Sequence, residues 1–241
     1  MDKDDNKYNE SLVKHILLSR FSDYYQYLTD NKQPAIDLYE PNLNVGVEIT
    51  EANLGTGFNQ FIQAGLDYTK NKLTDNAYKK LCDKNKKNML TLYPSGGFIA
   101  KEVKNKTGEI YDDSCDSQDK LVFDLFVSSL CKKNKHFIGH YDIFSNVDLF
   151  IHDLYYFHHL TNIDLFIELA LNFITSNQIY FRYVYFNMFT MDSANCVFQF
   201  DILNKTCEYI SISNHEMTIL GKYTYYEDLI NKEDEKRISK N

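Results

Sequence analysis

A β-hairpin is predicted for residues 34–51, which have the sequence PAIDLYEPNLNVGVEITE. Two runs rich in strand-forming residues, PAIDLYE and LNVGVEIT, meet at the turn-forming PNLN of residues 41–44. Each run contains an acidic residue, Asp37 in the first and Glu48 in the second. If the two runs pair as a hairpin, both carboxylates can project from the same face of the sheet. Asp37 and Glu48 are therefore the first candidates for an active centre.

Helices and further strands are predicted around this hairpin. An amphipathic helix is predicted at residues 8–28, because apolar residues recur there at spacings of three and four, namely Val13, Leu17, Phe21, Tyr24 and Leu28. The other expected elements are a helix at 56–81, a strand, turn and strand at 89–103, a polar loop at 105–117, a buried helix at 117–133, a strand at 147–154, a helix at 161–175 and three aromatic-rich strands near the C-terminus. This order predicts an α/β fold in which helices pack on a mixed sheet. We expect one domain over residues 1–241, with the C-terminal strands extending the same sheet.

The overall composition is that of a folded protein. Hydrophobic residues make up 44% and charged residues 25% of the 241 residues. No apolar run is long enough to span a bilayer, and the N-terminus is polar where a secretory signal would be apolar. The five cysteines form no CxxC pair, so reduced thiols are expected rather than disulfides or a structural zinc site. A cytoplasmic protein without a membrane partner is expected.

The charge is unevenly distributed along the chain. A net charge of −8 argues against nonspecific binding of nucleic acid over the whole surface. Between residues 70 and 106, however, ten lysines stand against three acidic residues. Such a basic segment attracts phosphates, and its candidate nucleic-acid contacts are Lys79, Lys80, Lys84, Lys86 and Lys87. The alternative is that these lysines form the solvated face of a helix.

Two converging carboxylates offer the hard oxygen ligands that Mg²⁺ prefers. The segment 37–51 resembles the core signature of the PD-(D/E)XK nuclease superfamily, in which an Asp in a hairpin is followed by Glu-x-Lys on the next strand. The resemblance extends in pattern over residues 8–154. It implies a restriction-endonuclease-like fold with residues 155–230 as an extension, and a Mg²⁺- or Mn²⁺-dependent phosphodiesterase acting on DNA. It also implies that Asp37 and Glu48 hold the metal, with Glu10 of the preceding helix assisting.

One residue departs from the signature. Thr50 stands at the lysine position, and a threonine cannot supply the positive charge that stabilises a developing anion. Some members of the superfamily resemble this Glu-x-Thr version and take their lysine from a neighbouring element. The best candidate for this replacement is Lys120, near the start of the predicted buried helix, and Lys101 is the second.

Each candidate also has an ordinary structural explanation. Asp37 and Glu48 can be exposed carboxylates of a hairpin, and Glu10 can favour the positive end of its helix dipole. Thr50 can serve as a β-former and Lys120 as a solvated lysine. The histidines match no specific metal signature, so structural or surface roles are expected for His136, His140, His152, His158 and His159. No nucleotide-binding or acyl-transfer motif is present.

Three hypotheses follow from the sequence. The first is the metal-dependent nuclease, with DNA as its partner. The second is a catalytically inactive binding or regulatory module of the same fold, which Thr50 and the acidic net charge favour. The third is a structural or partner-binding protein unrelated to nucleases, which would gain if Asp37 and Glu48 faced opposite sides of the sheet. A homodimer is compatible with all three.

Overall fold

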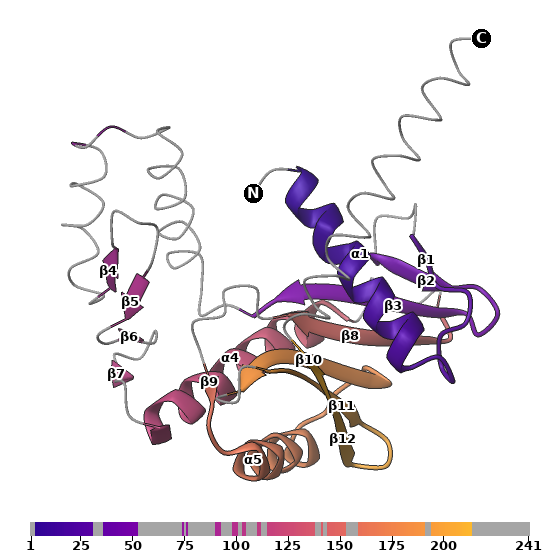
Figure 1. Ribbon diagram of the computed structural model, residues 1–241. Coiled ribbons are helices and arrows are strands. Elements are labelled where there is room, and N and C mark those ends of the chain that lie inside the picture. The colour runs from indigo at the N-terminus through magenta and orange to yellow at the C-terminus, as the bar shows by residue number, and fades with distance from the viewer. Residues whose placement is uncertain are drawn as a thin grey trace.

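The described part of the chain forms a mixed β-sheet with helices on both faces (Figure 1). The computed structural model describes residues 3–30, 36–52, 74, 76, 90–92, 98–100, 103–104, 110–111, 115–137, 141, 144–152, 159–190 and 194–213. Seven strands lie in the order β1-β2-β3-β8-β10-β11-β12, and β9 pairs with β10 outside this row. The α/β architecture expected from the sequence is therefore confirmed.

The elements of the sheet and its helices have the following bounds: α1 (Lys3–Arg20), β1 (Thr29–Asp30), β2 (Leu38–Glu40), β3 (Val45–Glu51), α4 (Cys115–His136), β8 (Asn146–His152), β9 (His159–Leu160), α5 (Ile163–Ser176), β10 (Tyr183–Thr190), β11 (Ala194–Asp201) and β12 (Thr206–Ser213). Two separate strand pairs are β4 (Leu90–Leu92) with β5 (Phe98–Ala100), and β6 (Val103–Lys104) with β7 (Ile110–Tyr111).

The predicted hairpin is present and lies inside the sheet. β2 and β3 pair antiparallel, with Leu38 opposite Val47, and the turn ends at Asn44 in the left-handed region (φ 49°). β3 then pairs with β8 in parallel, an arrangement that needs a long crossover connection between the two strands, and α4 lies in that connection. Gly46 allows close packing at this point, because a Cβ there would come 2.8 Å from the Ile36 side chain.

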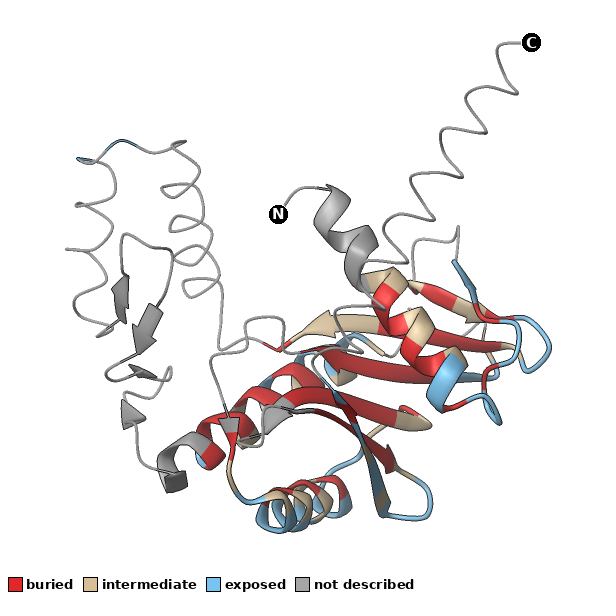
Figure 2. Ribbon diagram, viewed as in Figure 1, coloured by how far each residue is buried: buried red, intermediate tan, exposed pale blue. Residues whose placement is uncertain are grey.

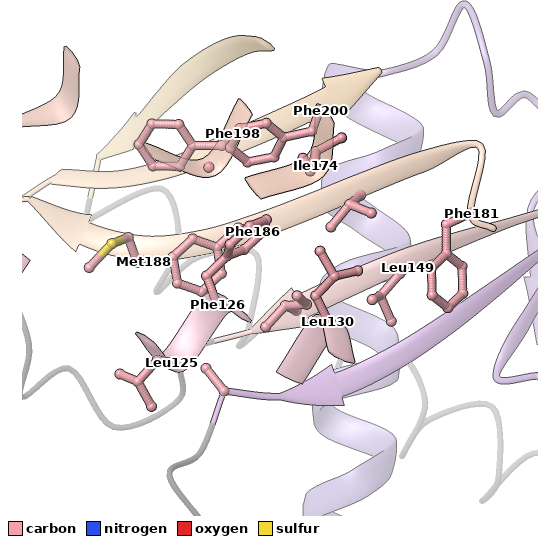
Figure 3. Close-up of a cluster of buried hydrophobic side chains, with 14 of the residues drawn as sticks. Leu125, Phe126, Leu130, Leu149, Ile174, Phe181, Phe186, Met188, Phe198 and Phe200 are labelled. Carbon is pink, nitrogen blue, oxygen red and sulfur yellow. The ribbon is translucent and has the colours of Figure 1, made fainter. Parts of the chain in front are cut away.

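The two faces of the sheet bury different layers. Side chains of alternate strand residues, such as Val45, Val47 and Phe150, pack against α1. Their neighbours, such as Leu149, pack with α4 and α5 in the larger cluster, part of which Figure 3 shows. That cluster includes Phe126 of α4 among the aromatic rings of β10 and β11. Figure 2 shows the resulting pattern, with buried strands between helices whose outer sides are partly exposed.

The first helix is shorter than its periodicity predicts. α1 ends at Arg20, whereas the apolar spacing predicted a helix to residue 28. Beyond the helix, Phe21 and Tyr25 remain buried, but Tyr24 is 37% exposed and does not continue the apolar stripe. The Tyr25 hydroxyl donates a hydrogen bond to a buried aspartate, Asp148 (2.6 Å). This tertiary contact explains why Tyr25 is buried and Tyr24 is not. The spacing of apolar residues along a helix could not predict it.

Most of the other predicted elements are also present. The strands near residues 89–103, the helix at 117–133, the strand at 147–154, the helix at 161–175 and the three C-terminal strands all have counterparts, and the C-terminal strands extend the main sheet. The predicted polar loop contains the strand β7, so that prediction was wrong there. The predicted helix at 56–81 lies almost wholly outside the described residues. Among the described helices, none is both long and apolar enough to cross a membrane.

Candidate active site

Asp37 and Glu48 lie on the same face of the sheet. Asp37 lies just before β2, and its N–H donates to the carbonyl of Val47, the residue opposite Leu38 (3.1 Å). The charge of Asp37 interacts with Glu48, and the charge of Lys133 interacts with both carboxylates, so the three side chains lie together on one side of the sheet. The face is the one covered by α4, because a side chain of α4 contacts Glu48. The arrangement that would have favoured the third hypothesis is therefore absent.

Asp37 is half-buried and is held to the hairpin through its side chain. Its Oδ2 accepts a hydrogen bond from the Ile49 N–H (2.6 Å), which fixes the carboxylate at the end of the hairpin. Burial raises the pKa of Asp37, although the Ile49 N–H and the positive charge of Lys133 act to lower it. A cation bound at Asp37 would oppose this rise in pKa and would favour the ionised carboxylate.

Glu48 is held by two side chains from the α4 side. The ammonium group of Lys133 donates to Glu48 Oε1 and forms an ion pair with it, and the Tyr141 hydroxyl makes a second hydrogen bond to the carboxylate. The Glu48 and Lys133 side chains are only 11% and 21% exposed. Burial raises the pKa of Glu48, Lys133 and Tyr141 oppose this, and the nearby Asp37 adds to the rise.

Lys133, and not Lys120, is the lysine that α4 brings to the carboxylates. Ser129 of α4 contacts the Glu51 carbonyl and Lys133 contacts Glu48, so the helix runs antiparallel to β3. Lys120 precedes Lys133 by thirteen residues, which is about 20 Å along a helix. The sequence singled out this helix as the source of the lysine but favoured its first turns. Its last turn, which contains Lys133, was not singled out.

The remaining candidates lie in different places. Thr50 shares the face of Glu48, pairs with Ile151 across the strands and is half-buried. Glu10 belongs to α1, the helix on the opposite face of the sheet. Within the described ranges, no three His, Cys, Asp or Glu side chains gather, so Glu10 does not join Asp37 and Glu48. Outside the described residues lie Lys101 and the five candidate nucleic-acid contacts, Lys79, Lys80, Lys84, Lys86 and Lys87.

The donor set fits a hard divalent cation. Asp37 and Glu48 lie close enough for their charges to interact, and burial raises the pKa of both because it disfavours their charged forms. A cation bound between them would reverse that effect, since an opposite charge within a few ångströms favours the ionised form. Mg²⁺ is commonly held by one or two carboxylates and completes its octahedron with waters and phosphate oxygens. Asp37 and Glu48 would be its protein ligands here.

A second carboxylate cluster lies on the α1 face, around Asp148 of β8. Asp148 is fully buried and accepts four hydrogen bonds, from the Tyr25 hydroxyl (2.6 Å), from Arg182 Nε (3.0 Å) and Nη2 (2.6 Å), and from the Tyr183 N–H (3.0 Å). Burial, and then the charge of Asp148, raise the pKa of Tyr25 far above its ordinary value, so its hydroxyl stays a donor. The cluster is complete and has the character of a structural network. The sequence analysis did not single it out.

His152 follows Asp148 on the same side of β8. Its Nδ1 lies 2.8 Å from the Asn187 side-chain amide, while its Nε2 is buried and has no hydrogen-bond partner among the residues that the structure describes. Burial lowers the pKa of His152 to about 4, so the ring is neutral at physiological pH. His136 is exposed at the end of α4. The side chains of the other candidates, His140, His158 and His159, lie outside the described residues.

Comparison of the chain with protein-family models, curated proteins and solved structures finds no match. The carboxylates, the lysine and the tyrosine of the α4 face are therefore the features from which a function can be inferred. Together they can hold a cation, orient a phosphate beside it and offer a positive charge to an anion that develops during a reaction.

Proposed function

We propose that the protein is a Mg²⁺- or Mn²⁺-dependent phosphodiesterase that cleaves DNA, with a divergent PD-(D/E)XK site. Asp37 and Glu48 are its metal ligands, and Lys133 takes the role of the missing motif lysine. The observation that carries the proposal is the ion pair of Lys133 with Glu48, on the face of the sheet that Asp37 shares. The signature places a lysine beside the two carboxylates, and this chain has Thr50 at that position. Lys133 supplies the positive charge that Thr50 lacks.

The order of elements also supports this proposal. A helix (α1), a hairpin (β2 and β3), a second helix (α4) and a strand parallel to β3 (β8) follow one another along the chain. This is the arrangement that the resemblance to the restriction-endonuclease-like fold implies. The strands β10 to β12 add to the far edge of that sheet, away from the hairpin.

Each side chain has a distinct task in the proposed reaction. A divalent cation bound here would polarise a water and would neutralise charge on the scissile phosphate. Asp37 and Glu48 hold that cation, and the Tyr141 hydroxyl fixes the orientation of Glu48. When a water oxygen attacks phosphorus, the bond to the leaving oxygen breaks, the water gives up a proton to solvent and the leaving oxygen takes one up. The Lys133 ammonium would stabilise the negative charge that grows on the phosphate during this step. Thr50 can donate a hydrogen bond on the same face.

Cleavage assays test the proposal directly. Plasmid and single-stranded DNA are incubated with the wild-type protein and Mg²⁺ or Mn²⁺, alongside Glu48→Ala, Lys133→Ala and Lys120→Ala. We expect Glu48→Ala and Lys133→Ala to lose at least about 100-fold in rate. Lys120→Ala is the matched control, because it removes the same charge from the far end of the same helix. Undiminished cleavage by Glu48→Ala would exclude this site.

A catalytically inactive module is the second candidate, and one observation favours it. Lys133 already occupies Oε1 of Glu48, so an internal cation holds an oxygen that a metal ion would need. In such a module Mg²⁺ and Mn²⁺ would fail to raise the melting temperature of the wild-type protein, and no DNA would be cleaved. A metal-dependent rise in melting temperature would favour the phosphodiesterase.

A further inference from the structure

A row of aromatic side chains runs from the candidate active site to a partly exposed tyrosine. The Tyr141 hydroxyl bonds to Glu48, and the Tyr141 ring lies 5.2 Å from Phe137, centroid to centroid. Phe137 in turn stacks on Tyr180 at 5.5 Å, with an angle of 25° between the rings. Tyr180 is 37% exposed. We call Tyr141, Phe137 and Tyr180 the aromatic row. It begins beside Glu48, a candidate metal ligand, and ends at the partly exposed ring of Tyr180.

The outer end of the row is held rigidly. The Tyr180 N–H donates to the Asn134 side chain (3.0 Å), and the Asn134 amide donates to the Gln178 carbonyl (2.8 Å). Both bonds fasten the segment before β10 to the last turn of α4. The neighbouring Phe181 is buried and packs edge-on against Phe137 (5.1 Å, 85°). Phe181 is therefore part of the hydrophobic core, whereas the ring of Tyr180 remains partly exposed to solvent.

Positive charge accompanies the row. Lys132 and Lys135 are exposed in the last two turns of α4, five and two residues before Phe137. This cluster of lysines contrasts with the net charge of −8 of the whole chain. Exposed lysines and aromatic rings on one segment are the combination that proteins use for single strands, because phosphates bind the lysines and bases stack on the rings.

We propose that this site takes single-stranded DNA, with an unpaired base stacked on Tyr180 and the adjoining phosphates on Lys132 and Lys135. The proposal rests on the phosphodiesterase function and specifies its substrate. A duplex buries the faces of its bases in its own stack, so an aromatic ring face selects unpaired bases. The row then leads the strand from Tyr180 toward the carboxylates Asp37 and Glu48.

The absence of tryptophan from the chain allows a direct test. Tyr180→Trp introduces a single indole, whose emission changes when a base stacks on it. The full-length variant is titrated with a labelled oligothymidine and with a duplex of equal length, both without divalent metal to prevent cleavage. Tyr209→Trp is the matched control, since Tyr209 is an exposed tyrosine of β12, in the strand row at the opposite end from β1 and β2.

We expect saturable quenching of Tyr180→Trp by the single strand, at least tenfold weaker binding of the duplex, and no quenching of Tyr209→Trp. We also expect Tyr180→Ala to weaken single-strand binding about tenfold and Tyr180→Phe to preserve it, because stacking needs the ring and not the hydroxyl. Equal binding of single strand and duplex, or an unchanged emission of Tyr180→Trp when anisotropy of the labelled strand reports saturation, would overturn the proposal.

The two proposals fail in different ways. If the wild-type protein cleaves duplex and single-stranded DNA equally and Tyr180→Ala cleaves like the wild type, the phosphodiesterase stands and the single-strand preference is overturned. If the protein cleaves no DNA with either metal but Tyr180→Trp is quenched by the single strand, the phosphodiesterase fails. The single-strand surface is then supported as part of a binding module.

Discussion

Two carboxylate clusters lie on opposite faces of the same sheet, and they differ in how completely the protein satisfies them. On the α1 face, the single carboxylate of Asp148 accepts four hydrogen bonds, two of them from Arg182. On the α4 face, Asp37 and Glu48 share one ammonium group, that of Lys133, together with one backbone N–H and one hydroxyl. Among the described residues, the first cluster therefore has four hydrogen bonds for one carboxylate, and the second has three donors for two carboxylates.

The difference separates a structural role from a binding role. A buried charge is costly unless partners replace the water it loses, so a carboxylate with four donors is stable as it stands. Burial raises the pKa of Asp37 and Glu48 in spite of Lys133. Carboxylates in that condition lower their free energy when a cation arrives. Perturbed pairs of this kind are typical of functional sites.

The largest effect on stability is expected from the complete cluster. Asp148 is fully buried, and Asp148→Asn removes the charged partner of the half-buried Arg182 guanidinium and places an amide donor against it. We expect the free energy of unfolding to fall by about 3–5 kcal/mol, the range for breaking a buried ion pair. Urea denaturation measures this change. A loss below about 1 kcal/mol would mean that the network contributes little to the fold.

Lys133→Met is expected to have a smaller effect on stability, and one that depends on pH. Without the ammonium group, the pKa values of Glu48 and Asp37 rise further. The folded protein then binds more protons than the unfolded chain, so its stability falls as pH rises through those values. The variant should lose more stability at pH 8 than at pH 5, measured by urea denaturation. Lys135→Met, the matched surface change, should show no such difference.

Asp37→Asn should have the smallest effect on stability. The asparagine can still accept the Ile49 hydrogen bond, but it lacks the buried charge. Wild-type Asp37 has a raised pKa in the folded state, so it favours folding at low pH and lowers stability as pH rises above the ordinary carboxyl value. We expect the variant to be as stable as the wild type or slightly more stable at pH 8. A clear loss of stability there would show that Asp37 is a structural residue like Asp148.

The sequence predicted the hairpin and its carboxylates better than the rest of the site. Strand alternation and a turn-forming tetrapeptide are local signals, and they suffice to align Asp37 with Glu48. The choice of Lys133 requires the end point of α4 and its direction relative to β3. Neither is encoded locally, because tertiary packing determines both. A scan for lysines in the last turn of that helix would have found it.

Buried polar networks were the hardest feature to predict. Asp148 lies in an otherwise apolar strand, and its partner Arg182 is 34 positions away in the sequence, so the pairing could not be predicted from neighbouring residues. Tyr25 is buried through its bond to Asp148, although helical spacing favours Tyr24. Contacts of this kind depend on the register of strands that are distant in sequence. They become visible only when the sheet is assembled.

Binding of Mn²⁺ tests the central claim most directly, because the α4-face cluster alone is expected to bind a cation. Isothermal titration and thermal unfolding are measured for the wild type, Asp37→Asn and Tyr209→Phe. We expect Mn²⁺ to bind the wild type and Tyr209→Phe with about one ion per chain and to raise their melting temperature, by an amount equivalent to about 2.7 kcal/mol at 100 times the dissociation constant. Asp37→Asn should remain folded and lose this response. Equal binding by Asp37→Asn, or no binding by the wild type, would contradict the account.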